Sequence, residues 1–205
     1  MNKKKKIILA SGSPRRKELM EQIGLSFQVY VSNADETTVE TNPGKIVEEL
    51  SFKKAEAVYK ELTAAEKKDL TLNEELLVIG ADTIVALDGQ ILGKPKSPDQ
   101  AKEMLRMLSG KKHQVYTGVT LIWGEGEQQR YSFSEETNVE FRELLDQEIE
   151  EYVATGDPLD KAGSYGIQGF CARYIKGIQG DYFNVVGLPV GALYQAMKEK
   201  VPEAL

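Results

Sequence analysis

Hydrophobic and polar positions along the chain alternate between short apolar runs and stretches with helical spacing. Apolar runs and alternating patterns predict strands at residues 5–10, 27–31, 76–85, 90–92, 115–123, 128–141 and 182–186. Apolar residues three and four apart predict helices at residues 14–23, 43–62, 97–108, 146–155 and 190–200. Residues 115–123 and 128–141 are joined by Gly124-Glu125-Gly126, which predicts a hairpin. This mixed order predicts an α/β protein with a partly antiparallel sheet.

The segments between these elements contain helix caps and polar residues but no sign of a domain boundary. Ser97 fits an N-cap, Pro98 fits the first helical position, and Gln100 fits a capping box. Residues 63–75 are polar and predict a surface excursion. No internal repeat or low-complexity linker is visible, so we expect a single domain over residues 1–205, or two lobes of it around one cleft.

Composition removes several classes of function. The 205 residues carry a formal net charge of −6, which argues against nucleic-acid and membrane binding. No run approaches the roughly 20 apolar residues of a membrane span, and the N-terminal lysines read as a solvated lead-in to the first strand. One cysteine, Cys171, fits a reducing compartment. One histidine, His113, excludes a multi-histidine metal site and favours a strand-edge role, so acid–base chemistry is expected from carboxylates, lysines and water.

The start of the first helix indicates an anion site. Ser13 fits its N-cap and Pro14 its first position, so Arg15 and Arg16 fall in the first turn, where free N–H groups already attract anions. Both arginines precede apolar residues of the buried stripe by one turn. The helix dipole would repel them, and a bound phosphate would offset that repulsion. The alternative is an ordinary capped helix whose arginines pair with acids elsewhere.

Further candidates are charged residues in apolar surroundings. Lys53 and Lys54 fall in a gap of the apolar stripe of helix 43–62, so Lys54 either snorkels to water or reaches a polar cavity. Asp82 lies inside an apolar strand, so it is either a hydrogen-bonded structural residue or part of a functional site. Lys94 follows a short strand. Asp35 and Glu36 form a loop pair that would suit Mg²⁺ or Mn²⁺ beside substrate phosphates, although such pairs are often merely solvated.

A glycine-rich segment, DPLDKAGSYGIQGF, lies late in the chain. Its glycines at positions 163, 166 and 169 would allow the backbone to approach a ligand closely. Gln168 between them carries a donor and an acceptor that suit a base edge.

Together these motifs resemble the Maf family. LASGSPRRKEL, KKAEAV, GADTIV, LGKP, LSGKKHQVYTGV, LDKAGSYGIQG and VVGLPV occur in this order over nearly the whole chain. The resemblance implies an inosine-triphosphatase-like α/β fold, with an elongated mixed sheet, flanking helices and a central cleft. It also implies a protein, often a homodimer, that hydrolyses nucleoside triphosphates to the monophosphate and pyrophosphate with a divalent cation. We also expect a cytoplasmic location.

The resemblance also implies roles for individual residues. Asp82 would be the catalytic base and Glu36 the metal-associated carboxylate. Ser11 and Ser13 lie in the signature loop. The phosphate-binding cations would be Arg15, Arg16, Lys54 and Lys94. Arg15, Thr83 and Gln168 would set specificity, in the combination typical of the dTTP/UTP subgroup.

We therefore expect a pyrophosphatase acting on dTTP, UTP and modified pyrimidine nucleotides in nucleotide-pool housekeeping. One alternative is specificity for 7-methyl-GTP or another purine triphosphate. Another is a regulatory binding protein in septum formation, as the family name suggests.

Overall fold

The computed structural model describes residues 5–31, 33–66, 75–124 and 128–205. Within these residues, a seven-stranded mixed sheet has the order β2-β1-β3-β5-β6-β7, with β4 paired to β3. The strands are β1 (Lys6–Ala10), β2 (Phe27–Val29), β3 (Leu76–Leu87), β4 (Gln90–Leu92), β5 (Lys112–Trp123), β6 (Gln129–Phe141) and β7 (Ile175–Gln179). β1 is parallel to β2 and β3, whereas β4 and β7 pair antiparallel with β3 and β6. The predicted α/β class with a mixed sheet is confirmed.

Helices flank these strands. They are α1 (Pro14–Gln22), α2 (Pro43–Glu66), α3 (Pro98–Leu108), α4 (Asp146–Ala154), α5 (Tyr182–Val186) and α6 (Val190–Lys200). Short 3-10 turns cover η1 (Asp157–Asp160), η2 (Ala162–Ser164), η3 (Gly169–Tyr174) and η4 (Pro202–Ala204). Within the described part of the chain, none of the helices has the length and apolar character needed to cross a membrane.

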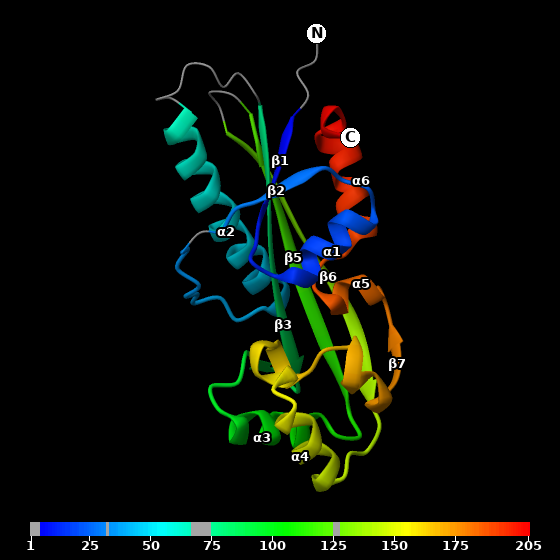
Figure 1. The fold of residues 1–205 in the computed structure, drawn as a ribbon. Coiled ribbons are helices and arrows are strands. Elements are labelled where there is room, and N and C mark those ends of the chain that lie inside the picture. Colours follow the sequence, from blue (N-terminus) through cyan, green and yellow to red (C-terminus); the bar gives the residue numbers. More distant parts are fainter. Residues whose placement is uncertain (1–4, 32, 67–74, 125–127) are drawn as a thin grey trace. The chain divides into compact units, whose positions relative to one another are not determined.

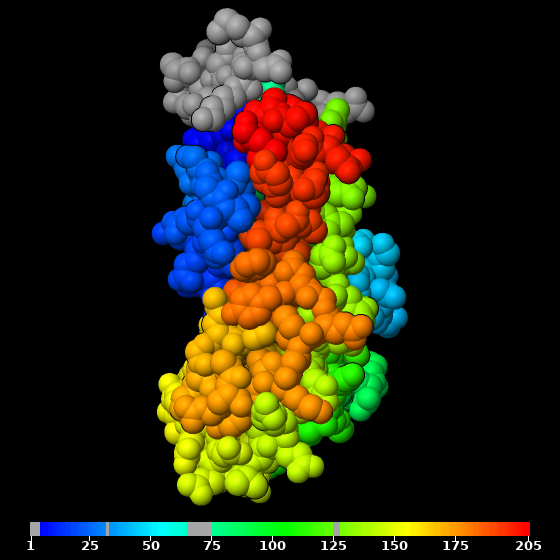
Figure 2. Space-filling model, turned by 90° about the vertical axis from the view of Figure 1, so that its right-hand side faces the viewer, coloured from blue at the N-terminus to red at the C-terminus, as the bar shows by residue number. Residues whose placement is uncertain are grey.

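The chain divides into two compact units, and the first comprises residues 1–82, 117–134 and 187–205. Figure 1 shows α2 on one side of the strands of this unit, with α1 and α6 on the other. Figure 2 shows α1 (blue) and α6 (red) side by side on one face. One cluster of the core joins α2 to the strands: Ile8, Ala10, Ala55, Val58, Tyr59, Leu76, Val78 and Ile122.

Two glycines let α2 lie directly on the sheet. A Cβ atom built on Gly80 would lie 2.2 Å from the carbonyl oxygen of Ser51, and one on Gly118 would lie 2.2 Å from the carbonyl group of Val47. Both obstacles are backbone atoms, which cannot rotate away. The Ser51 hydroxyl also lies 2.8 Å from that of Thr120 on β5. This close approach fixes the helix from which Lys54 projects.

The N-terminal lysines were expected to be solvated, and for Lys5 this is wrong. Lys5 is 6% exposed and pairs with the carboxylates of Glu75 and Glu203, the latter at 3.2 Å. A buried ammonium requires such partners because desolvation of an unpaired charge is costly. The lysines before it lie outside the described residues.

The second unit comprises residues 83–116 and 135–186. Its core joins the second half of β3 to β4, α3 and α4, and its buried members include Val85, Leu105, Phe141, Tyr152 and Tyr165. Ser97 caps α3 as predicted, its side chain accepting from the backbone N–H of Gln100 at 3.2 Å. The side chain of Gln100 instead accepts from the N–H of Lys96, so the predicted capping box does not close.

Several boundaries differ from the predictions. Residues 182–186 form α5 rather than a strand, because the side chain of Asp181 accepts from the N–H of Phe183 at 2.8 Å and starts a helix. β7 was not predicted, since most of its residues are exposed and no apolar alternation marks it. β2 ends at Val29, and α2 continues to Glu66. The rest of the predicted excursion, residues 67–74, and the Glu125-Gly126 turn lie outside the described residues.

Candidate active site

Two carboxylates of the first unit meet at one lysine. The Nζ atom of Lys54 lies 2.6 Å from Oδ1 of Asp82 and 3.1 Å from Oε1 of Glu36. The side chains of Lys54 and Asp82 are 17% and 11% exposed, whereas that of Glu36 is 63% exposed. Lys54 therefore reaches into a polar site and does not snorkel to bulk water. Asp82 is partnered, as a buried aspartate must be.

The elements that carry these groups are fixed by the packing of α2. Asp82 follows the fully buried run from Leu77 to Ala81 on β3, so its backbone has little freedom. Lys54 comes three residues after Ser51, whose carbonyl touches Gly80 of the same strand. A helix pressed onto a strand at this point brings the lysine to the aspartate.

The first turn of α1 carries Arg15 and Arg16, and Arg16 lies within electrostatic range of these carboxylates. Ser11 is buried, and its Oγ atom accepts from Nη1 of Arg16 at 3.1 Å. The Nε–H of Arg16 donates to the carbonyl oxygen of Gly187 at 2.7 Å. Burial lowers the pKa of Arg16, and Arg15 acts in the same direction, while the charges of Asp82 and Glu36 oppose the shift. The guanidinium of Arg16 therefore lies within electrostatic range of Asp82, Arg15 and Glu36.

Arg16 therefore has a structural task in addition to its charge. Two of its five N–H donors hold the signature loop against the segment that contains Gly187. Ser13 occupies the N-cap of α1, but its side chain makes no capping hydrogen bond, and its N–H donates to Ser11 at 3.3 Å. The first turn of α1 has no acidic residue to offset the positive end of the helix dipole.

Cations and carboxylates alternate in this cluster. Lys54 contacts both Asp82 and Glu36, and the charges of Asp82, Arg15 and Glu36 all act on Arg16. Within the described residues, no group of three or more His, Cys, Asp or Glu side chains is arranged to hold a metal ion. The two carboxylates supply hard oxygen donors of the kind that Mg²⁺ and Mn²⁺ prefer, and such ions commonly complete their shell with substrate phosphates. The donor chemistry therefore fits the expected divalent cation.

The other predicted residues belong to the second unit. Thr83 is half-buried on β3, while Lys94 and Gln168 are exposed. The N–H of Gly163 donates to the carbonyl oxygen of Gly93 at 3.0 Å, which joins the glycine-rich segment to the segment that carries Lys94. Gly163 has a φ of +66°, a conformation that glycine adopts readily.

Lys161 serves the same glycine-rich segment. Its Nζ atom lies 2.9 Å from Oδ1 of Asp157 and 2.7 Å from Oδ1 of Asp160. Asp157 also accepts from the hydroxyl of Tyr152 at 2.7 Å, and that hydroxyl accepts from the N–H of Gly166 at 3.2 Å. These contacts fix the backbone just before Gln168.

His113 and Cys171 are core residues. His113 is fully buried on β5, and its Nε2 atom lies 2.7 Å from the hydroxyl of Tyr165. Burial lowers its pKa to about 4, so the imidazole is neutral at pH 7. Burial likewise raises the pKa of the Cys171 thiol to about 12, which leaves it a poor nucleophile. His113 is thus structural, as expected, but lies in the core.

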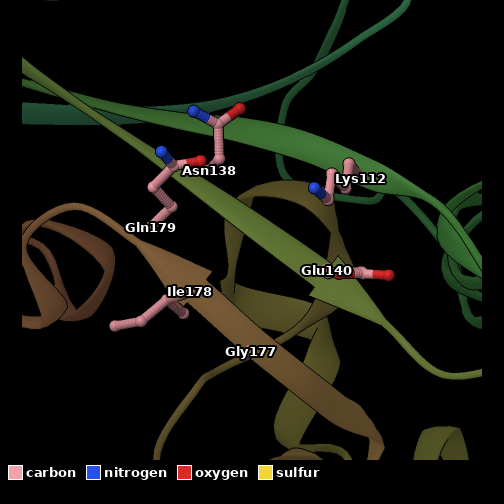
Figure 3. A pocket seen from close by; sticks show the side chains of 6 residues that line it. All are labelled: Lys112, Asn138, Glu140, Gly177, Ile178 and Gln179. Atoms are coloured by element: carbon pink, nitrogen blue, oxygen red, sulfur yellow. The ribbon is translucent and has the colours of Figure 1, made fainter.

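A shallow cavity of about 180 Å³ lies elsewhere in the second unit. It is lined by Lys112, Asn138, Glu140, Gly177, Ile178 and Gln179, and includes none of the predicted site residues. Figure 3 shows these side chains spread over neighbouring strands without converging on one point. Glu140 is already paired with Lys176 at 2.7 Å. This cavity therefore lacks the convergent polar groups of a ligand site.

With this geometry established, similarity to known proteins assigns the family. A family model described as "Maf-like protein" matches residues 6–200. The chain belongs to this family. A dTTP/UTP pyrophosphatase of Agathobacter rectalis is 51% identical over 197 residues, covering 94% of this chain and 96% of the relative. A dTTP/UTP pyrophosphatase of Bacillus cytotoxicus is 50% identical over 196 residues, covering 95% of each.

Solved structures show a more distant likeness. The crystal structure of a nucleoside-triphosphatase, or dITP/XTP pyrophosphatase, from Mycobacterium abscessus is 15% identical to this chain. The match covers 97% of this chain and 96% of the other, with a TM-score of 0.42.

Sequence reasoning missed some residues that shape the site. Gly187 contributes its carbonyl oxygen to Arg16 across 171 positions in the chain, and no local pattern reveals this. Lys53 was singled out with Lys54, but Glu49 was not, and the sequence did not reveal that the two bind the loop that carries Glu36. Their four-residue spacing predicts an ion pair on a helix but does not reveal that this pair binds a loop.

Proposed function

We propose that this protein is a nucleoside triphosphate pyrophosphatase that hydrolyses dTTP and UTP to the monophosphate and pyrophosphate. The observation that carries the proposal is the ammonium of Lys54 between the carboxylates of Asp82 and Glu36. Relatives of about 50% identity over about 95% of the chain bear the name of this activity. A cluster of cations around a buried carboxylate is also what cleavage of a charged phosphoanhydride needs.

In the proposed reaction, a water oxygen forms a bond to the α phosphorus while the bond to the α–β bridging oxygen breaks. Asp82 accepts the proton of the attacking water, and Lys54 orients that carboxylate through the 2.6 Å contact. Pyrophosphate leaves with the bridging oxygen. Arg15, Arg16 and Lys94 are proposed to bind the phosphates, and the buried Ser11 to hold Arg16 in position.

A divalent cation is part of this proposal. Glu36 and Asp82 would hold it together with substrate phosphate oxygens. When bound, it would neutralise phosphate charge and polarise the phosphoryl group under attack. The chain's own cations would share that task, because a triphosphate carries about four negative charges.

Specificity is proposed to depend on Arg15, Thr83 and Gln168. The exposed amide of Gln168 offers a donor and an acceptor to a pyrimidine edge. The double variant Thr83→Gln, Gln168→Glu should shift preference toward purine triphosphates. An unchanged preference would contradict this assignment.

We further propose that the enzyme acts as a homodimer in the cytoplasm, in line with the family resemblance. A separate role in septum formation can be distinguished genetically. If Asp82→Asn abolishes hydrolysis but leaves a division phenotype intact, that role is independent of catalysis.

The first experiment measures pyrophosphate release from a panel of nucleoside triphosphates with Mg²⁺ or Mn²⁺. Wild type is compared with Asp82→Asn and with Asp88→Asn, which removes an exposed carboxylate at the β3–β4 turn. We expect release from dTTP and UTP in wild type and Asp88→Asn, and its loss in Asp82→Asn. Absence of release from every nucleotide by folded wild-type protein would refute the proposed function.

A further inference from the structure

Two neighbouring lysines of α2 have different partners. Lys54 contacts the carboxylates of Asp82 and Glu36, whereas Lys53 donates to the main-chain carbonyl oxygen of Thr37. Lys53 also pairs with Glu49, one helical turn earlier, at 2.6 Å. We propose that Glu49 and Lys53 form a loop clamp that holds residues 35–38 against α2 and positions Glu36 for metal and substrate. This inference rests on the proposed function.

The loop clamp binds two consecutive residues of the loop. Oε2 of Glu49 accepts from the hydroxyl of Thr38 at 2.6 Å, and Lys53 binds the carbonyl of Thr37. The two clamp residues are joined to each other, so the contacts form one network. The hydrogen bond from Lys53, and to a smaller extent the one from Thr38, lowers the pKa of Glu49. Glu49 therefore remains ionised, as the loop clamp requires.

The loop is also closed on the other side of Glu36. Oδ1 of Asp35 accepts from the N–H of Thr37 at 2.9 Å, and its Oδ2 accepts from the hydroxyl of Thr37 at 2.8 Å. This turn encloses Glu36 between two anchored residues. Thr37 is therefore bound by Asp35 from within the loop and by Lys53 from the helix.

Glu36 needs this support because its own contact is weak. Its side chain is 63% exposed, and an exposed ion pair contributes little free energy by itself. The contact with Lys54 cannot order a loop whose described residues 33–42 have no regular secondary structure. The loop clamp supplies the order, so that the carboxylate of Glu36 is already near Asp82 when a cation and substrate arrive.

A weakened clamp has a specific kinetic consequence. If Glu36 is in position in only a fraction of molecules, the apparent affinity for the cation falls by that fraction, and excess cation restores the active arrangement. A tenfold loss of the ordered state should therefore raise the half-activating Mn²⁺ concentration by about tenfold. kcat at saturating Mn²⁺ should stay within about threefold of wild type, because Lys53 itself does not touch substrate in this account.

The test compares Lys53→Met and Glu49→Gln with the conservative variant Lys53→Arg. Lys60→Met is the matched control, because Lys60 lies on the same helix in an exposed ion pair with Glu56. Pyrophosphate release from dTTP is measured against Mn²⁺ concentration. Amide hydrogen exchange of residues 33–42 is measured in the same proteins without nucleotide.

We expect Lys53→Met to raise the Mn²⁺ requirement and to accelerate exchange in residues 33–42, with Lys53→Arg close to wild type. Lys53→Met that matches Lys60→Met in both measurements would overturn the inference. A loss of kcat that saturating Mn²⁺ does not restore would also overturn it, since Lys53 would then act on substrate. If wild type has no hydrolytic activity, the proposed function fails, while hydrogen exchange still tests the loop clamp.

Discussion

Removal of the Lys54 ammonium should lower both kcat and the free energy of unfolding. The surroundings of Lys54 determine the size of each effect. Lys54→Met keeps a side chain of similar length that can follow the same path from α2. It leaves Asp82, 11% exposed, without its partner at 2.6 Å. Lys60→Met is the control, because the side chain of Lys60 is 65% exposed in an ion pair with Glu56.

The stability cost lies between two limits. Breaking a fully buried ion pair by removing one partner costs about 3–5 kcal/mol, and breaking an exposed pair costs about 0–1 kcal/mol. Lys54 and Asp82 are mostly buried, while the contact with the exposed Glu36 adds little. We therefore expect the free energy of unfolding to fall by about 2–3 kcal/mol, which corresponds to a decrease of about 4–12 °C in Tm for a chain of this size.

The catalytic cost should be larger. Loss of one preorganised electrostatic group at a reacting centre typically lowers kcat by about 10²–10³, or about 2.7–4 kcal/mol in the transition state. Initial rates of pyrophosphate release at saturating dTTP measure the decrease in kcat, and thermal unfolding measures the decrease in Tm. Activity in Lys54→Met within about threefold of Lys60→Met, a difference below about 0.7 kcal/mol, would refute the placement of Lys54 in the site.

Three further predictions concern the framework around the site. Burial lowers the pKa of His113 from 6.5 to about 4, so between these pH values the unfolded chain binds a proton that the folded protein excludes. The stabilisation from neutral His113 is therefore fully present above pH 6.5 and is lost as the pH falls toward 4. Urea unfolding should show a loss of about 3 kcal/mol between pH 7 and pH 4 that is absent in His113→Phe, and parallel pH profiles would contradict this cause. Gly118→Ala should lower the free energy of unfolding in urea by about 3 kcal/mol or more, because the new Cβ meets the backbone of α2. Gly191→Ala, with open space around it, should leave this free energy unchanged. Equal free energies of unfolding for the two variants would show that α2 can move away from the sheet. Tyr152→Phe removes the hydroxyl contacts with Asp157 and Gly166. If the glycine-rich segment positions Gln168, steady-state kinetics should show that this variant raises KM for dTTP more than it lowers kcat. A change in Tm alone would assign Tyr152 a purely structural role.

Local sequence patterns predicted most of the helices and strands of this protein. Pro14 and Ser97 marked helix starts, and continuous apolar runs marked the buried strands, because capping and burial depend on near neighbours. The same reasoning failed at residues 182–186, where one hydrogen bond, donated by the N–H of Phe183 to the side chain of Asp181, starts a helix in a run that favours a strand by propensity. It also missed β7, whose place at the sheet edge depends on pairing with β6 rather than on a pattern of its own.

The candidate site shows the same division. The sequence alone indicated which residues carry unusual charge, since Asp82 in an apolar strand and Lys54 in an apolar stripe are expensive unless each has a partner. It left open whether they were partners of each other. Only the tertiary structure decided this, because the contact joins residues 28 positions apart and exists only where Gly80 lets α2 rest on β3. Likewise, the four-residue spacing of Glu49 and Lys53 predicts an ion pair on a helix surface, but only the folded chain shows that a loop carrying Glu36 is bound to it.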